Sequence, residues 1–168
     1  LENLAAILQR ESSQDPPTLE SSVNALRAVL ALDSVLSSRG PFGVHLAWLD
    51  AALSAAEKAD APVALTAEAY EARGRARRVR GRTHEALADL GKARSLAATA
   101  KAPGLEARAL AQIGNALYQQ GKLDDAMLCL EEGVRIVPVG DRATEGLLLS
   151  FRGFVAMDSH RFAEAEAF

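Results

Sequence analysis

Six arginines lie within ten residues in the middle of the chain, and no acidic residue separates them. They are Arg73, Arg75, Arg77, Arg78, Arg80 and Arg82. Guanidinium groups recognise carboxylates and phosphates through paired hydrogen bonds. On a helix, positions 73, 77 and 80 share one side and positions 75, 78 and 82 share another. The segment therefore has two interpretations: a solvated helix face partly paired with Glu68, Glu71 and Glu85, or a binding site for an anionic partner.

Nucleic acid is the less favoured anionic partner. The Arg73–Arg82 segment contains no aromatic residue on which a base could stack. The chain also has a formal net charge of −3, whereas nucleic-acid-binding domains are usually basic. A helical solenoid that binds nucleic acid or another anion through this segment is the alternative to a protein-binding module.

The remaining reactive residue types form no catalytic or metal-binding pattern. The three histidines, at 45, 84 and 160, are far apart, and the sequence has neither a His-x₃-His nor a Cys-x₂-Cys pair. Cys129, the one cysteine, lies between two leucines and is predicted to be a core thiol. The pair Asp124-Asp125 is predicted to favour the start of a helix. We expect no catalytic residue, no metal and no cofactor, and we predict that the chain is not an enzyme.

The composition favours helices. Of 168 residues, 34 are alanine and 24 are leucine, both strong helix formers, whereas isoleucine and valine together number only 13. The longest apolar stretches, such as residues 147–149, are far too short to span a membrane. A single cysteine excludes an internal disulfide framework and fits a reducing compartment, so we expect a cytoplasmic protein.

Proline and glycine divide the sequence into segments of ordinary helix length. Apolar residues recur in these segments with helical spacing, as Leu123, Met127 and Leu130 do. Helices are predicted near residues 1–11, 18–38, 44–60, 62–80, 83–99, 104–120, 123–136, 142–158 and 161–168, with the last break near His160. Connections of a few residues make consecutive helices antiparallel neighbours.

The sequence repeats itself with a period of 39–40 residues. Glycines recur at 74, 114 and 153, and alanines recur 12 residues after each of them, at 86, 126 and 165. Gly81 and Gly121 also correspond, and His160 takes their place in the third copy. A glycine inside a helix lowers helix stability by about 1 kcal/mol relative to alanine, so its recurrence indicates a close approach to a neighbouring helix. Gly114 is accordingly predicted to lie mid-helix, close to Ala126 of its partner helix.

The best copy, residues 107–138, resembles the tetratricopeptide repeat family. The residues at the family's signature positions are Leu110, Ile113, Gly114, Leu117, Ala126, Leu130 and Pro138. The family's usual period is 34, so the extra residues lie in the second helix or the link that follows. Arg73, Arg77 and Arg152 depart from the pattern, because apolar residues are expected there. The resemblance implies an all-α fold, a right-handed superhelix of antiparallel helix pairs.

The chain is accordingly predicted to be a single repeat domain. It would comprise a partial repeat over residues 1–17, a degenerate repeat over 18–61, repeats over 62–102 and 103–140, and a truncated repeat over 141–168. Repeats this long are similar to the helical sensor arms of bacterial multidomain signal-transduction ATPases and transcriptional regulators. The predicted function is therefore protein–protein interaction in the arm of a larger bacterial signalling or transcription-regulatory protein.

The resemblance also implies where a partner would bind. In this family the first helix of each pair lines a concave groove that binds peptides and proteins. The corresponding residues here are Arg75, Arg78, Arg108, Asn115, Tyr118 and Gln119, followed by Phe154 and Met157. Ala111 stands where a carboxylate-clamp lysine would be, so the chaperone-tail mode is not expected. We predict an acidic protein or peptide partner, with Arg75 and Asn115 on one common surface.

The two ends of the sequence, Leu1 and Phe168, fall inside predicted helices. Repeat arrays need polar terminal caps, and apolar faces without them associate. We therefore expect self-association through the ends of the array.

Overall fold

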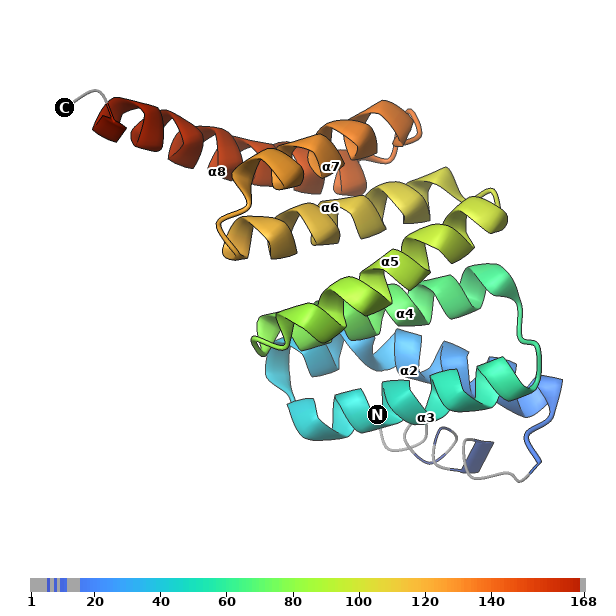
Figure 1. The fold of residues 1–168 in the computed structure, drawn as a ribbon. Helices are drawn as coiled ribbons and strands as arrows, with labels where there is room; N and C mark the ends of the chain where they lie inside the picture. Colours follow the sequence, from blue (N-terminus) through green and yellow to red (C-terminus); the bar gives the residue numbers. More distant parts are fainter. Residues whose placement is uncertain (1–5, 7, 9, 12–15, 167–168) are drawn as a thin grey trace. The chain divides into compact units, whose positions relative to one another are not determined.

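The chain is helical throughout the part that its structure describes. The computed structural model describes residues 6, 8, 10–11 and 16–166, with side chains as far as residue 159. Over these residues it has seven principal helices and no strand (Figure 1). They are α2 (Leu19–Arg39), α3 (Phe42–Lys58), α4 (Val63–Val79), α5 (Thr83–Thr99), α6 (Pro103–Gln119), α7 (Leu123–Ile136) and α8 (Arg142–Glu166). The predicted all-α class is confirmed, while most of the helix expected over residues 1–11 lies outside the described residues.

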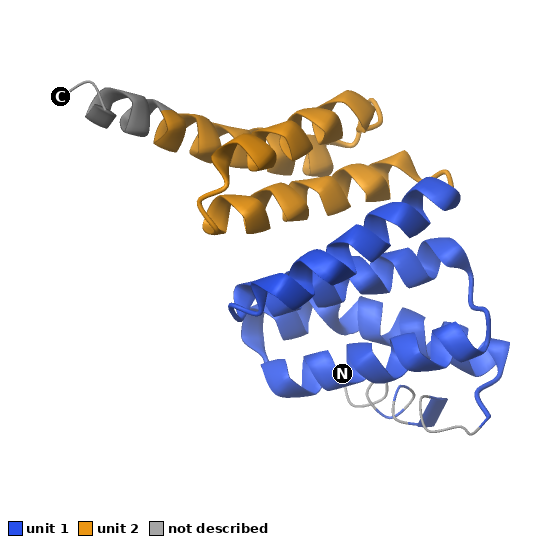
Figure 2. Cartoon of the chain, in the orientation of Figure 1, with its two compact units in different colours: residues 1–100 blue, residues 101–168 orange. Residues whose placement is uncertain are grey.

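The helices fall into two compact units. Unit 1 covers residues 1–100 and contains α2 to α5, and unit 2 covers residues 101–168 and contains α6 to α8 (Figure 2). Each unit is described by itself below.

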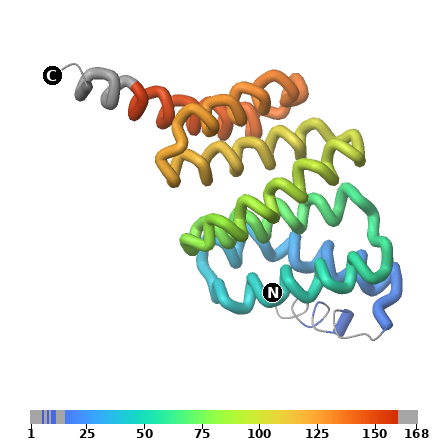
Figure 3. Tube along the Cα trace, in the orientation of Figure 1, coloured from blue at the N-terminus to red at the C-terminus, as the bar shows by residue number. Residues whose placement is uncertain are grey.

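In unit 1, α2 and α3 form an antiparallel hairpin. The Ser22 hydroxyl near the start of α2 donates to the Ala55 carbonyl near the end of α3, over 3.1 Å. At the other end, His45 Nε2 lies 3.2 Å from Asp33 Oδ1. Figure 3 shows the two helices running in opposite directions. Thr18 caps α2, because its hydroxyl accepts the Ser21 amide over 3.1 Å and supplies a partner for an otherwise free helix terminus.

The second hairpin of unit 1, α4 with α5, packs around a glycine. A β-carbon built on Gly74 would lie 2.7 Å from Leu90 Cγ and 3.2 Å from the Ala86 carbonyl oxygen. The helices are antiparallel, since Arg73 pairs with Asp89 of α5 while the earlier residue Tyr70 meets the later residue Lys92. Helix α4 also contacts α2 and α3, so it joins the two hairpins of unit 1.

Unit 2 repeats this arrangement in α6 and α7. A β-carbon on Gly114 would lie 2.6 Å from Leu130 Cγ and 3.3 Å from the Ala126 carbonyl oxygen. The predicted close approach of Gly114 to its partner helix is therefore confirmed. Gly133 of α7 provides a second close contact, because a β-carbon there would lie 2.5 Å from Leu148 Cδ2 of α8. Leu130 and Leu148 are completely buried in the resulting core.

The turns after α4 and α6 have the same geometry in both units. Gly81 and Gly121 each adopt φ of +73°, a left-handed conformation that favours glycine. At both turns the amide three residues beyond the helix donates to a carbonyl five residues earlier: Arg82 to Arg77, and Lys122 to Leu117, each over 3.0 Å. The 40-residue repeat is thus visible in the backbone hydrogen bonds as well as in the sequence.

The third copy departs from this pattern. The expected break near His160 is wrong, because α8 continues without interruption from Arg142 to Glu166 (Figure 1). His160 stands where the first two copies have a glycine with positive φ, and a residue with a β-carbon rarely adopts that conformation. Without the left-handed residue, the hydrogen bonds that end α4 and α6 have no counterpart, and the helix runs on.

One face of α8 consequently remains open. Among the atoms that the structure describes, none lies within 4 Å of a β-carbon built on Gly153, although the equivalent glycines of α4 and α6 are in close contact with a partner helix. The neighbouring side chains of Leu149, Phe154 and Met157 are 49%, 50% and 54% exposed. The side chain of Ala165, the expected partner of Gly153, lies outside the described residues.

These glycines allow a paired test of helix packing. Gly114→Ala is expected to destabilise the protein by roughly 1–3 kcal/mol, because the added methyl group overlaps Leu130 and a backbone carbonyl lies behind it. Gly153→Ala adds the same methyl group to open space and is expected to stabilise α8 by up to about 1 kcal/mol. Urea denaturation of both variants checks the difference. Equal effects of the two substitutions would show that the close contact is absent.

The open face of α8 is predicted to mediate self-association. Replacing Leu149 and Met157 by glutamine should lower the mass measured by light scattering at high protein concentration, because the variant has less apolar surface to bury between copies. Leu128→Gln on α7 is a matched control, since that leucine is 65% exposed and lies on another helix. A wild-type mass that stays monomeric at every concentration would contradict the prediction.

Candidate partner-binding site

The six residues predicted to line one groove are divided between the two units. Arg75 and Arg78 lie on α4 of unit 1, and the other four lie on α6 of unit 2. Their common surface therefore stays a prediction, and each group is examined within its own unit.

In unit 2 the predicted residues differ in accessibility. Asn115 is buried, Arg108 and Tyr118 are half-buried, and Gln119 is exposed. The Tyr118 hydroxyl donates to Asp158 Oδ2 over 2.6 Å, so this tyrosine connects α6 to α8. Of the four residues, Gln119 is the most accessible to a partner.

On α4 of unit 1, Arg73 and Arg77 bind carboxylates from both neighbouring helices. Arg73 forms a bidentate pair with Asp89 of α5, over 2.7 and 2.9 Å, and also reaches Asp50 of α3 over 2.8 Å. Arg77 contacts the same two aspartates, over 2.7 and 3.2 Å. Asp89 is buried, while Asp50 is about half exposed. This four-residue network explains why arginines occupy positions where the repeat pattern expects apolar residues.

Arg75 lies on the opposite side of α4 and is also paired. Its guanidinium binds Asp33 of α2, and its Nε lies 3.6 Å from Glu71 Oε1 one turn earlier. Burial raises the pKa of Asp33, but the hydrogen bond from His45 and the charge of Arg75 lower it by more. The pKa of Asp33 therefore lies below its ordinary value. Asp33 is therefore a carboxylate that holds α2, α3 and α4 together.

Arg82 belongs to the surface. It pairs with Glu85 three residues later, through two hydrogen bonds at the start of α5. The hydrogen bond from Arg82 lowers the pKa of the Glu85 carboxyl. Exposed pairs of this kind contribute little to stability. Four of the six arginines thus have carboxylate partners from this chain.

Arg78 and Arg80 have no carboxylate within ion-pair distance among the described residues. The Arg78 guanidinium is partly buried, and its Nε forms no hydrogen bond there. Burial and the positive charge of Arg75 lower the pKa of Arg78, and the negative charge of Glu71 offsets this only in part. The guanidinium of Arg80 instead lies over the ring of Phe42, 5.5 Å from its centroid. The two arginines without an ion-pair partner among the described residues therefore lie near the C-terminal end of α4, on different sides of it.

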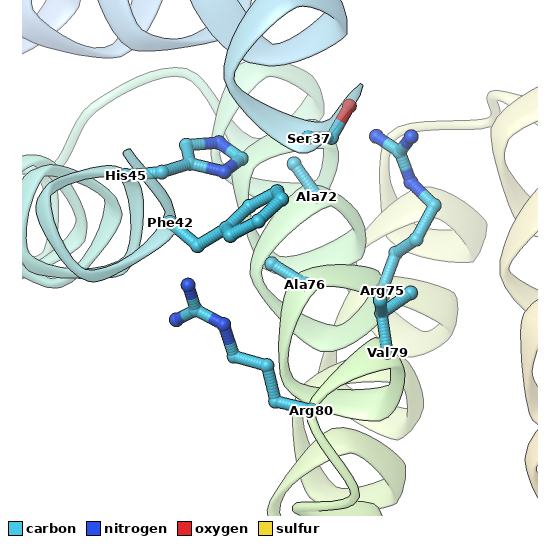
Figure 4. Close-up of a pocket in the computed structure, with 8 residues that line it drawn as sticks. All are labelled: Ser37, Phe42, His45, Ala72, Arg75, Ala76, Val79 and Arg80. Atoms are coloured by element: carbon cyan, nitrogen blue, oxygen red, sulfur yellow. The ribbon is translucent and has the colours of Figure 1, made fainter. Parts of the chain in front are cut away.

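A pocket of about 170 Å³ opens beside this end of α4 (Figure 4). Its lining comes from α2, α3 and α4 and consists of Ser37, Phe42, His45, Ala72, Arg75, Ala76, Val79 and Arg80. Figure 4 shows Arg80 extending toward Phe42, while Arg75 extends along the other side of the pocket. The arrangement combines an apolar floor with guanidinium groups at its edge.

Two further findings concern other kinds of site. Over the residues that the structure describes, no group of three or more His, Cys, Asp or Glu side chains is placed to hold a metal ion. In the same part of the chain, none of the helices combines the length and the apolar composition of a membrane span.

Sequence reasoning missed the carboxylates that neutralise the arginines and also missed the pocket. Of the three glutamates expected to pair with the cluster, Glu71 and Glu85 do contact arginines. The main partners are instead three aspartates: Asp33, Asp50 and Asp89. Asp89 could have been found from the hairpin register, because Gly74 meets Leu90. Asp33 lies 42 residues from Arg75, and no local pattern connects the two.

Comparisons with protein-family models, curated proteins and solved structures find no match to this chain.

The arginine network gives a prediction about stability. Asp89→Asn is expected to destabilise the protein by about 3 kcal/mol, because two partly buried guanidiniums lose the buried carboxylate that they share. Asp50→Asn is the control, and its effect is expected to stay below about 1 kcal/mol, since water already solvates that carboxylate. Chemical denaturation measures both changes. A smaller effect for Asp89→Asn than for Asp50→Asn would contradict this account of the network.

Proposed function

We propose that the chain is a non-enzymatic interaction module of the tetratricopeptide type that binds an acidic segment of a partner protein through the C-terminal half of α4. The repeated glycine contact and the repeated turn after α4 and α6 support the repeat assignment. In this proposal successive hairpins stack as a right-handed superhelix, and the module serves as a cytoplasmic sensor or scaffold arm in a bacterial signalling or transcription-regulatory protein.

The proposal is carried by the uneven neutralisation of the arginine cluster. Four arginines are matched by carboxylates of this chain, but Arg78 and Arg80 are not, among the described residues. Arg78 is partly buried beside Arg75, and the charge of Glu71 offsets the effects of burial and of Arg75 only in part, so the pKa of Arg78 is lowered. A carboxylate supplied by a partner would stabilise the charged form of Arg78, and hydrogen bonds between charged groups are among the stronger ones.

The same observation disfavours a nucleic-acid backbone as the ligand. Tight binding to a phosphate backbone requires several free cations along a track. In this cluster Arg73, Arg75 and Arg77 already hold buried or partly buried carboxylates, which phosphates would have to displace. A short acidic protein segment needs only the two arginines that remain.

A labelled peptide of eight glutamates tests the proposal directly. Its binding, followed by fluorescence anisotropy at low salt, is expected to weaken at least about tenfold in the double variant Arg78→Gln, Arg80→Gln, because two charge-assisted contacts are lost. Binding should also weaken as salt is added.

The control is the double variant Arg27→Gln, Arg142→Gln, which removes the same charge from two exposed arginines on α2 and α8. A peptide of eight glutamines controls for the backbone. If the two double variants lost affinity equally, binding would depend on net charge rather than on this site, and the proposal would be wrong.

A further inference from the structure

The pocket beside α4 has the size of one apolar side chain. Its volume is about 170 Å³, and an apolar cavity of about 150 Å³ is large enough to bind benzene. A phenyl ring or a branched aliphatic group would therefore fill it. A nucleobase with its sugar, or a larger cofactor, would extend well beyond this volume into solvent.

The walls of the pocket are apolar and incompletely covered. Ala72 and Ala76, one turn apart on α4, form the floor, and Phe42 and Val79 flank it. Phe42 is 49% exposed and Val79 is 67% exposed. The ring of Phe42 and the methyl groups of Val79 therefore face water where a ligand would cover them. Burying apolar surface of this kind is the main source of affinity in small recognition pockets.

The polar groups at the edge specify the charge of the ligand. Arg75 is already balanced by Asp33 and Glu71, and the buried ring of His45 faces Asp33 across 3.2 Å. Arg80 has an aromatic contact with Phe42 but no carboxylate among the described residues. The uncompensated charge at the pocket edge is thus a single guanidinium, which selects a ligand with a carboxylate next to its apolar group.

We propose that this pocket gives the site sequence specificity for its acidic partner. It accepts one phenylalanine or leucine side chain between Phe42 and Val79, while the adjacent Asp or Glu pairs with Arg80. This inference rests on the proposed function and adds its specificity: the partner carries an apolar residue flanked by acids rather than a purely acidic tract.

Three labelled peptides separate the inference from the proposed function: four glutamates on each side of a central Phe, the same peptide with a central Ala, and the Phe peptide with glutamines in place of all glutamates. The acidic Phe peptide is expected to bind at least about tenfold more tightly than the acidic Ala peptide, through burial of its ring. The glutamine peptide is expected to lose most of the affinity because Arg80 has no anion to bind.

Variants that fill or open the pocket test whether the preference for the Phe peptide arises there. Ala76→Leu places a larger side chain in the pocket and is expected to abolish the preference for Phe over Ala, while Ala64→Leu, at an exposed position of the same helix, is expected to retain it. Val79→Ser reports on the pocket independently, because that side chain is mostly exposed and its replacement spares the core. It is expected to reduce the preference for Phe severalfold, and thermal melting confirms that each variant is folded.

The outcomes distinguish the two proposals. Equal binding of the acidic Phe and Ala peptides, with dependence on Arg78 and Arg80 retained, would overturn the pocket inference and leave the proposed function in place. A preference for Phe that folded Ala76→Leu and Val79→Ser variants keep would also overturn it, because the ring would bind elsewhere. Failure of every acidic peptide to bind would overturn both.

Discussion

Two helices of each repeated hairpin lie close together because neither Gly74 nor Gly114 carries a β-carbon. At both positions an alanine would bring a methyl group within 3 Å of a leucine branch point on the partner helix. The close approach sets the register of the hairpin. In unit 1 that register places Asp89 opposite Arg73 and Arg77, so the charge pairing on α4 depends on a contact made by a residue with no side chain.

The helices and their turns could be predicted from the sequence because the signals that form them are local. Apolar spacing and the left-handed glycines at 81 and 121 act within a few residues, and the mid-helix glycines show themselves by recurring with the period of the repeat. The same local reasoning failed at His160, where a break was expected because the earlier copies have one. The structure shows that the glycine, rather than the position in the repeat, ends the helix.

The binding surface was harder to predict because its chemistry depends on residues that are distant in sequence. An arginine cluster looks uniformly cationic when it is read along the chain. In the folded unit it is divided: the network with Asp50 and Asp89 is structural, and the charge that remains lies at Arg78 and Arg80. The arginines that pair with carboxylates are distinguished from those that do not only by the positions of α2, α3 and α5 around α4. The spacing of the arginines within α4 does not predict which of them are paired.

The sharing of Asp50 and Asp89 by the same two arginines has a consequence for how unit 1 unfolds. Asp50 belongs to the first hairpin and Asp89 to the second, and both arginines lie on α4, the first helix of the second hairpin. In a linear array of hairpins, cooperativity comes from the coupling energy between neighbours. Here part of that coupling is ionic. Separating the two hairpins would remove the carboxylate of Asp50 from Arg73 and Arg77. We therefore expect the two hairpins of unit 1 to unfold more cooperatively than unlinked hairpins would, and added salt to weaken the part of the coupling that passes through the half-exposed Asp50.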